Sequence, residues 1–295
     1  MMNYRLKGFL QLCRPANLPT AVADVLAGLA IAGFFTNYES NLAIAGFLTV
    51  LSSIFLYAGG VVLNDVFDIN LDKIERPERP IPSGLIKLNE ARFFGILLIS
   101  FGIILPFFVT IKIGVIASLL ALLIITYDGF SKKYRVLGPL NMGLCRGCNL
   151  LLGIAFFGSF NPIWYIIIPI LYIAAITMVS QGEVHGKNKK NILLAGILYA
   201  IVVLLIIVFN GLTSPIKITS YLFLGTFIYS IGLPLLKAYQ NNIPQNIKKA
   251  VKAGVISIIL LDAILVVHFS NIFIGLLVVL LLPVSILLAK AFAVT

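Results

Sequence analysis

Long apolar segments follow one another along almost the whole chain, and short polar connections separate them. These segments run over about 18–36, 42–63, 93–110, 113–127, 139–158, 162–180, 191–209, 218–236, 250–268 and 272–289. Most are close to the ~20 residues that a helix needs to cross a hydrocarbon core of ~30 Å. Only helices satisfy their backbone hydrogen bonds within such a segment. The pattern therefore predicts nine or ten membrane spans, depending on how the chain after residue 250 divides.

Composition strengthens this interpretation. The 295 residues are 60% hydrophobic and 11% charged, whereas soluble domains carry about 25% charged residues. So few charges cannot cover the surface of a water-soluble chain of this length. We therefore exclude a soluble globular protein, a disordered tail and a coiled coil. We expect an all-α fold, a polytopic transmembrane helical bundle, with residues 1–295 forming one domain.

The net charge of +11 is distributed very unevenly between the two sides of the expected bundle. With ten spans, 20 of the 22 Lys and Arg residues fall on one side, and only Lys112 and Lys217 fall on the other. Positive loops remain cytoplasmic, so we expect a multi-pass protein of the cell inner membrane with both termini in the cytoplasm. The basic balance is thus an orientation signal toward membrane lipids, and we expect no nucleic-acid partner.

Nearly half of the acidic residues lie in one short segment, NDVFDINLDKIERPERPIPSG, directly after the second apolar stretch. Asp65, Asp68 and Asp72 are spaced i, i+3, i+7, which predicts three carboxylates on one face of a continued helix. Such carboxylates repel one another and are costly near the hydrocarbon edge. Mg²⁺ removes both problems, because it binds oxygen ligands and shares its shell with substrate phosphates. The alternative is a solvated charged loop.

Several cations and amides accompany these carboxylates. Asn64 opens the acidic set, and the forked guanidinium groups of Arg76 and Arg79 suit phosphate oxygens. Farther along, the adjacent Lys132 and Lys133 either bind the same diphosphate or anchor a helix end among lipid head groups.

Arg146 is flanked by apolar residues on both sides. A charge in this setting faces a bundle interior or a cavity rather than lipid. It therefore either touches a substrate or serves as a structural hydrogen-bond hub.

The segment from Asn64 to Asp72, with Arg76 to Gly84 behind it, resembles the first aspartate-rich motif of the UbiA family of intramembrane prenyltransferases. Arg14-Pro15-Ala16-Asn17 is similar to the start of the first span of that family. The resemblance implies a helical bundle, usually of nine spans, in which two aspartate-rich helix ends face a central cavity. It also implies that Mg²⁺ holds the diphosphate of a polyprenyl donor there, with the isoprenoid tail in a lipid-open tunnel.

The second aspartate-rich motif of the family departs from its pattern in this chain. Family members typically place an aspartate where Glu183 stands and another near Lys187. A second metal would then have only Glu183, with His185 as an uncommon ligand. Either Lys187 supplies in fixed form the charge of that metal, or Glu183 and His185 act as acid and base on the acceptor. With Asn141 to Arg146, this segment resembles the divergent, EboC-like branch of the family. That resemblance implies the fold of the family and no particular reaction.

We therefore predict Mg²⁺-dependent transfer of a prenyl group from a polyprenyl diphosphate to an aromatic or other small lipophilic acceptor within the membrane. The predicted catalytic and metal-binding residues are Asp65, Asp68, Asp72 and Glu183. The predicted substrate-binding residues are Asn64, Arg76, Arg79, Lys132, Lys133, Arg146, His185 and Lys187. One alternative is a non-catalytic or transport role that binds an isoprenoid diphosphate. Another is a CDP-alcohol phosphotransferase. Asp128-Gly129 matches the beginning of the motif of that class, but the residues that follow do not match the rest of it.

Overall fold

The structure, a computed structural model, describes residues 4–36, 39–40, 42–213 and 218–292. All regular secondary structure in these ranges is helical. The α-helices are α1 (Tyr4–Leu12), α2 (Leu18–Ile31), α3 (Leu42–Phe67), α4 (Ile69–Glu75), α5 (Leu88–Phe107), α6 (Ile111–Gly129), α7 (Leu137–Ile154), α8 (Ile167–Ser180), α9 (Lys189–Thr213), α10 (Ile218–Gln240), α11 (Pro244–Phe269), α12 (Ile272–Val279) and α13 (Leu281–Ala291). Three short 3₁₀ helices accompany them: η1 (Pro15–Asn17), η2 (Ser131–Lys133) and η3 (Ile163–Ile166).

The prediction of an all-α membrane bundle is confirmed. Among the described residues, eight helical stretches are long and apolar enough to cross a membrane, namely α3, α5, α6, η3 with α8, α9, α10, α11, and α12 with α13. Two of the expected stretches do not meet this criterion. The stretch at Pro15–Ile31 is shorter, and α7 carries the polar Arg146 and Asn149. Both helices lie inside the bundle, so neither has to be long and apolar all round.

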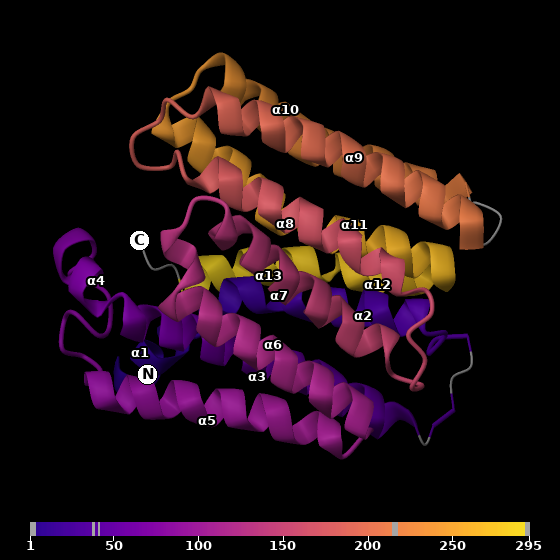
Figure 1. Cartoon of the computed structure of the whole chain (residues 1–295), viewed down its shortest axis with the longest axis horizontal. Coiled ribbons are helices and arrows are strands. Elements are labelled where there is room, and N and C mark those ends of the chain that lie inside the picture. The colour runs from indigo at the N-terminus through magenta and orange to yellow at the C-terminus, as the bar shows by residue number, and fades with distance from the viewer. Residues whose placement is uncertain (1–3, 37–38, 41, 214–217, 293–295) are drawn as a thin grey trace.

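The helices form a layered bundle (Figure 1). α2, α7 and α11 lie along its middle, with α3, α5 and α6 to one side and α9 and α10 to the other. α2 packs on both α7 and α11, and α8 packs on α7, α9 and α11. Of the eight candidate spans, α11 is the most buried. The core therefore surrounds α2, α7 and α11 and continues toward the outer helices.

Two glycines let α2 and α7 approach very closely. A Cβ atom on Gly28 would lie 2.2 Å from the carbonyl oxygen of Leu150, and one on Gly153 would lie 2.4 Å from that of Val25. Small residues at membrane helix contacts permit backbones to come together in this way. The contact brings the polar side chains of the two helices within hydrogen-bond reach of one another.

The acidic segment is bent, contrary to the predicted continuous helix. α3 ends at Phe67, and α4 begins only at Ile69, because the backbone of Asp68 leaves the helical region at φ −89° and ψ 7°. The amide of Asp68 still donates to Asn64, and the amide of Asp72 donates to Asp68. The chain therefore bends without losing these hydrogen bonds. Asp65 and Asp72 point toward Arg79, whereas Asp68 points toward Lys132.

Candidate active site

A cavity of about 340 Å³ lies among α2, α3, α6, α7, α8 and α11. Much of its wall is apolar, and Leu56, Leu120, Ile124, Ile173, Ile176, Val255 and Ile258 line it. Polar side chains line it in two groups, which meet where the hydroxyl of Thr20 donates to the carbonyl of Asn17. One group, beside the ends of α3 and α6, has Arg14, Asn17, Asn64 and Asp128, and the other has Thr20, Ser53, Tyr57, Arg146 and Asn149. Asn64 and Ser53 are eleven positions apart on α3, or roughly 16 Å along its axis.

We call the first polar end and the charged side chains bonded to it the mouth cluster. Its members are Arg14, Asn64, Asp65, Asp68, Asp72, Arg79, Asp128 and Lys132. We call the second the floor cluster. Its members are Thr20, Asp24, Ser53, Arg146, Asn149 and Asp262.

Two arginines hold two of the predicted carboxylates in the mouth cluster. Oδ1 of Asp65 accepts from Nη2 of Arg14 at 2.5 Å and lies 3.1 Å from Nη1 of Arg79. The same Nη1 of Arg79 is 2.7 Å from Oδ2 of Asp72. Asp65 is 6% exposed and Asp72 is 3% exposed. A guanidinium thus bridges two buried carboxylates, at a point where a bound cation could also bridge them.

The third carboxylate turns toward the end of α6. Oδ1 of Asp68 is 2.6 Å from Nζ of Lys132, which belongs to η2. The side-chain amide of Asn64 donates to Oδ1 of Asp128 at 2.7 Å. The bend at Asp68 therefore connects the first motif to the Tyr127–Tyr134 segment, and the two segments form one charged cluster.

The donor set of the mouth cluster fits Mg²⁺ in its chemistry. The available ligands are the carboxylate oxygens of Asp65, Asp68 and Asp72 and the amide oxygen of Asn64, and hard divalent cations prefer oxygen ligands. In the described part of the chain, no three ionisable ligands are already gathered as a metal site. Each carboxylate is instead paired with Arg14, Arg79 or Lys132. A metal would take over these carboxylates and release the cations toward phosphate oxygens.

The residues of the second motif lie in the turn between α8 and α9. Glu183 is half-buried and His185 and Lys187 are exposed, and none of the three lines the cavity. Burial raises the pKa of the Glu183 carboxyl, and the charges of Lys248 and Arg76 partly offset that increase. Glu183 is therefore in electrostatic contact with the first motif only through Arg76. Arg76 and Lys133 are themselves exposed, away from the bonded part of the mouth cluster.

The floor cluster is built around Arg146, which α7 contributes. Nη1 of Arg146 is 2.8 Å from Oδ2 of Asp24, and its Nη2 donates to the hydroxyl of Thr20 at 2.6 Å. Asn149 donates to the same Asp24 oxygen at 2.9 Å and accepts from the Ser53 hydroxyl at 2.7 Å. Arg146 therefore lines the cavity, and it joins α7 to α2 through an ion pair with Asp24 and a hydrogen bond to Thr20. Contact with a substrate stays a prediction.

Sequence reasoning did not assign four ionisable residues that the structure brings into these clusters. Arg14 was noted only as part of the start of the first span, yet it pairs with Asp65. Asp24 and Asp262 stand inside apolar stretches, and an ionisable residue there is a signal of function. Asp128 stands beside two lysines, but its partner is Asn64. In each case the missing information was the partner, which lies far away in the sequence.

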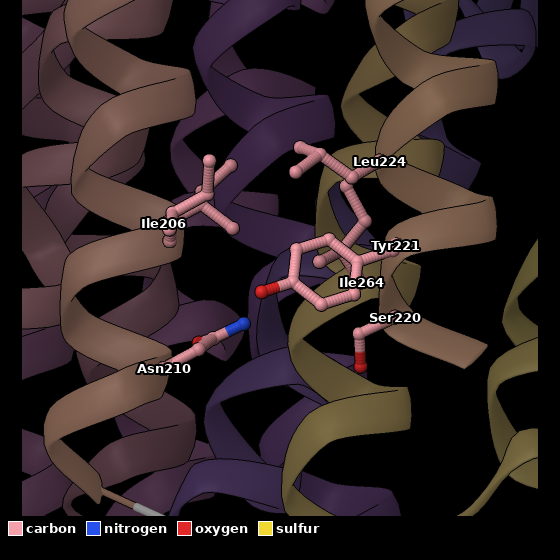
Figure 2. Close-up of a pocket in the computed structure, with 7 residues that line it drawn as sticks. Ile206, Asn210, Ser220, Tyr221, Leu224 and Ile264 are labelled. Atoms are coloured by element: carbon pink, nitrogen blue, oxygen red, sulfur yellow. The ribbon is translucent and has the colours of Figure 1, made fainter. Parts of the chain in front are cut away.

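A second cavity, of only about 10 Å³, lies between α9, α10 and α11. Its labelled side chains in Figure 2 are the apolar Ile206, Leu224 and Ile264 and the uncharged polar Asn210, Ser220 and Tyr221. It has no acidic or basic side chain in its wall and is too small for a substrate. The larger cavity with its two polar ends is therefore the candidate active site.

The fold and the site define an intramembrane enzyme whose apolar internal cavity ends in a cluster of carboxylates, arginines and a lysine. The UbiA prenyltransferase family model matches residues 21–231, and the chain belongs to this family. The chain is thus a multi-pass membrane protein and a prenyltransferase of that family.

Relatives and solved structures agree with this membership. The chain is 31% identical over 279 residues to the digeranylgeranylglyceryl phosphate synthase of Methanocaldococcus jannaschii, covering 87% of this chain and 95% of that protein. It is 37% identical over 149 residues to the synthase of the same name from Methanosarcina mazei, a match that spans only 52% of that protein. A solved structure of digeranylgeranylglyceryl phosphate synthase has a TM-score of 0.70 at 25% identity, covering 90% of this chain and 99% of that one.

A UbiA homologue from Archaeoglobus fulgidus, bound to GPP and Mg²⁺, shares the fold. Its TM-score is 0.67 at 16% identity, with 92% of this chain and 99% of that chain covered.

Proposed function

We propose that the mouth cluster binds the diphosphate of a polyprenyl donor together with Mg²⁺, and that the cavity holds the isoprenoid chain and a lipophilic acceptor. The carrying observation is the pair of nearly buried carboxylates, Asp65 and Asp72, which one guanidinium holds. Asp65 is joined to the cavity through Arg14, which lines it. Burial of carboxylates is costly unless they are paired. A site that keeps such carboxylates paired near a cavity can exchange an arginine partner for Mg²⁺.

In this proposal Asp65, Asp68 and Asp72 hold Mg²⁺, which supplies positive charge to the leaving diphosphate when bound. Arg14, Arg79 and Lys132 donate hydrogen bonds to the diphosphate oxygens, and these bonds strengthen as the C–O bond of the donor breaks and charge develops there. The apolar wall of the cavity excludes water from the allylic cation. The acceptor then forms a bond to the prenyl carbon and loses a proton, while inorganic diphosphate leaves.

We assign the second-motif residues a supporting part in the same proposal. Glu183 faces the charge of Arg76 and thereby positions that arginine at the rim of the mouth. His185 and Lys187 add polar groups to the same exposed turn, where they are accessible to a donor that enters from this side. The whole chain acts as one domain, with this rim and both termini on the cytoplasmic side of an inner membrane.

The decisive experiment is donor binding and diphosphate release by the protein in lipid nanodiscs, with geranyl diphosphate as the probe. We expect binding to require Mg²⁺ and to be lost in excess EDTA. Asp68→Asn should lower diphosphate release about 100-fold, the usual cost of removing one electrostatic partner of a transition-state charge.

The matched control is Glu90→Gln, because Glu90 is an exposed carboxylate whose partner, Arg5, lies outside the site. This control should keep full binding and turnover. Equal binding of geranyl diphosphate in Mg²⁺ and in EDTA would overturn the metal assignment. Tight, Mg²⁺-dependent binding without product formation from any lipophilic acceptor would instead favour the carrier role.

A further inference from the structure

A closed ring of three hydrogen bonds is formed by residues that belong to neither cluster. The side-chain amide of Gln181 donates to the backbone carbonyl of Arg135 at 3.1 Å, and Nη2 of Arg135 donates to Oδ1 of Asn191 at 3.2 Å. The side-chain amide of Asn191 in turn donates to Oε1 of Gln181 at 3.1 Å. We call these three residues the Asn191 ring. Each of them both donates and accepts, so the ring fixes all three relative to one another.

The Asn191 ring joins two connections that belong to different halves of the chain. Arg135 lies in the connection between α6 and α7, three residues after Lys132. Gln181 directly follows α8, and Asn191 is the third residue of α9. Apart from the two hydrogen bonds of Arg135, no hydrogen bond or ion pair joins residues 130–136 to residues 181–191 in the part of the chain that the structure describes. The Asn191 ring therefore supplies the polar contacts between these two connections.

The α6–α7 connection also carries a member of the mouth cluster. Nζ of Lys132 is 2.6 Å from Oδ1 of Asp68. Lys132 lies in η2, a short 3₁₀ turn in which the amide of Tyr134 donates to the carbonyl of Ser131 at 3.0 Å. Because this turn is tight and Arg135 follows it directly, a displacement of Arg135 also displaces the backbone of Lys132.

Stability alone does not explain a polar residue at position 191. Asn191 is only 5% exposed, whereas Arg135 and Gln181 are exposed and can bond to water instead. An apolar side chain of similar size at position 191 would need no partners, and such a replacement is nearly neutral for stability when the former partners remain satisfied. The contribution of the ring is therefore the defined position that it gives to Arg135.

From these contacts we infer that Asn191 and Gln181 are positioning residues for prenyl transfer. They hold Arg135, and through it they hold Lys132 where its ammonium group meets the diphosphate of the donor. A displacement of about 1 Å in a group that orients the reaction is costly in rate. Arg135 does not line the cavity, so it acts through Lys132 and not on the substrate. This inference rests on the proposed function, because the position of Lys132 matters only if Lys132 contacts the diphosphate.

The test is a double-mutant cycle on the full chain in nanodiscs, followed by steady-state release of diphosphate from geranyl diphosphate in Mg²⁺. Lys132→Met should lower release about 100-fold, and Asn191→Leu should lower it about tenfold. In the Lys132→Met chain, Asn191→Leu should change release by less than about twofold, because no ammonium group is left to position. A residue that only stabilises the fold would lower release by the same factor in both chains.

Asn246→Leu is the matched control. Asn246 is the third residue of α11, as Asn191 is of α9, and it donates to the carbonyl of Asn241 within its own connection. This control should keep release within about twofold of the unmodified chain.

Gln181→Met is a second variant that opens the ring at an exposed residue, where the fold tolerates the change. It should lower release about threefold, as expected for one neutral hydrogen bond, and only in the chain that keeps Lys132. It tests the inference even if Asn191→Leu does not fold.

Equal losses from Asn191→Leu in the presence and in the absence of Lys132 would overturn the inference, and so would full activity of both ring variants. A loss in Asn246→Leu as large as that in Asn191→Leu would also overturn it, because the effect would then not belong to the ring. If Lys132→Met releases diphosphate as fast as the unmodified chain, or if the unmodified chain releases none, the proposed function itself fails. That result differs from equal losses in the two chains.

Discussion

The two polar ends of the cavity use the same residue types in opposite ways. In the mouth cluster, the side chains of Arg14 and Asp68 are 35% and 26% exposed, whereas in the floor cluster those of Arg146 and Asp24 are 9% and 1% exposed. The mouth is built from helix ends and connections, and the floor from residues within α2, α3, α7 and α11. At the mouth, the Arg14–Asp65 and Lys132–Asp68 pairs each include one partly exposed side chain, so water there lets them exchange partners. The Arg146–Asp24 pair of the floor is fixed by burial, and the Arg79 pairs of the mouth are nearly as buried.

The largest expected effect is loss of stability at the floor. Arg146→Met leaves Asp24 buried without its cation, and breaking a buried pair in this way costs about 3–5 kcal/mol. Arg146→Met/Asp24→Leu removes both charges and should recover most of that loss. Unfolding of the purified variants, followed by circular dichroism in a denaturant titration, measures both. A double variant that is as unstable as the single one would contradict the view that the pair is fixed by burial.

The next largest effect is loss of turnover at the mouth. Asp65→Asn removes the charge that Arg14 and Arg79 share, and should lower diphosphate release about 100-fold. Because Arg14 is partly exposed and Arg79 keeps its contact with Asp72, the free energy of unfolding should fall less than it does in Arg146→Met. A large stability loss with little change in turnover would show that Asp65 serves stability rather than turnover, contrary to this comparison of the two ends. The measurement is steady-state release of diphosphate beside denaturant unfolding of the same sample.

A smaller effect is expected from the shape of the bridging cation. Arg79→Lys keeps the charge but loses the guanidinium whose single Nη1 contacts both Asp65 and Asp72. We expect about a tenfold lower affinity for geranyl diphosphate in Mg²⁺, because one charged hydrogen bond is lost. Lys132→Arg is the matched control, since Lys132 contacts one carboxylate, Asp68, and does not bridge two, and this change should lower affinity less. Equal effects of the two changes would show that only charge matters at the mouth.

The smallest effect is expected at Glu183, which lies outside both clusters. Glu183→Gln should change turnover less than about twofold, since the charges that act on Glu183 are those of Lys248 and Arg76, both outside the two clusters. A loss near 100-fold would support the prediction that Glu183 is catalytic.

The same substitution gives a pH signature. The folded-state pKa of Glu183 is raised by burial, so the folded protein binds this proton more tightly than the unfolded chain does. The contribution of Glu183 to the free energy of unfolding therefore falls as the pH rises from below the ordinary pKa of a glutamate through the raised pKa of the folded state. Unfolding midpoints measured from pH 4 to 8 should show Glu183→Gln gaining stability relative to the parent chain over that rise. A relative loss would contradict the direction of the shift.

Much of the fold and part of the site could be predicted without coordinates. The long apolar stretches predicted most of the membrane spans and predicted that they are helices, because lipid requires helices with internal hydrogen bonds. The crowding of Asp65, Asp68 and Asp72 located the charged end of the cavity, since few acids are tolerated in such a chain. The bend at Asp68 was not predictable, because i, i+3, i+7 spacing describes a straight helix and does not reveal that Lys132 draws one carboxylate away.

The sequence by itself determined that this chain crosses a membrane as a helical bundle and that its acids and cations gather at one end of the spans. Both follow from the chemistry of short segments of consecutive residues. Only the tertiary structure decided that Arg14 completes the mouth, that Glu183 lies outside it and that Arg146 meets Asp24 at the floor. These pairs join residues that are distant in sequence, and glycine contacts such as Gly28 with Gly153 bring them together. Because pairing energy depends on distance and burial, no pattern along the chain contains it.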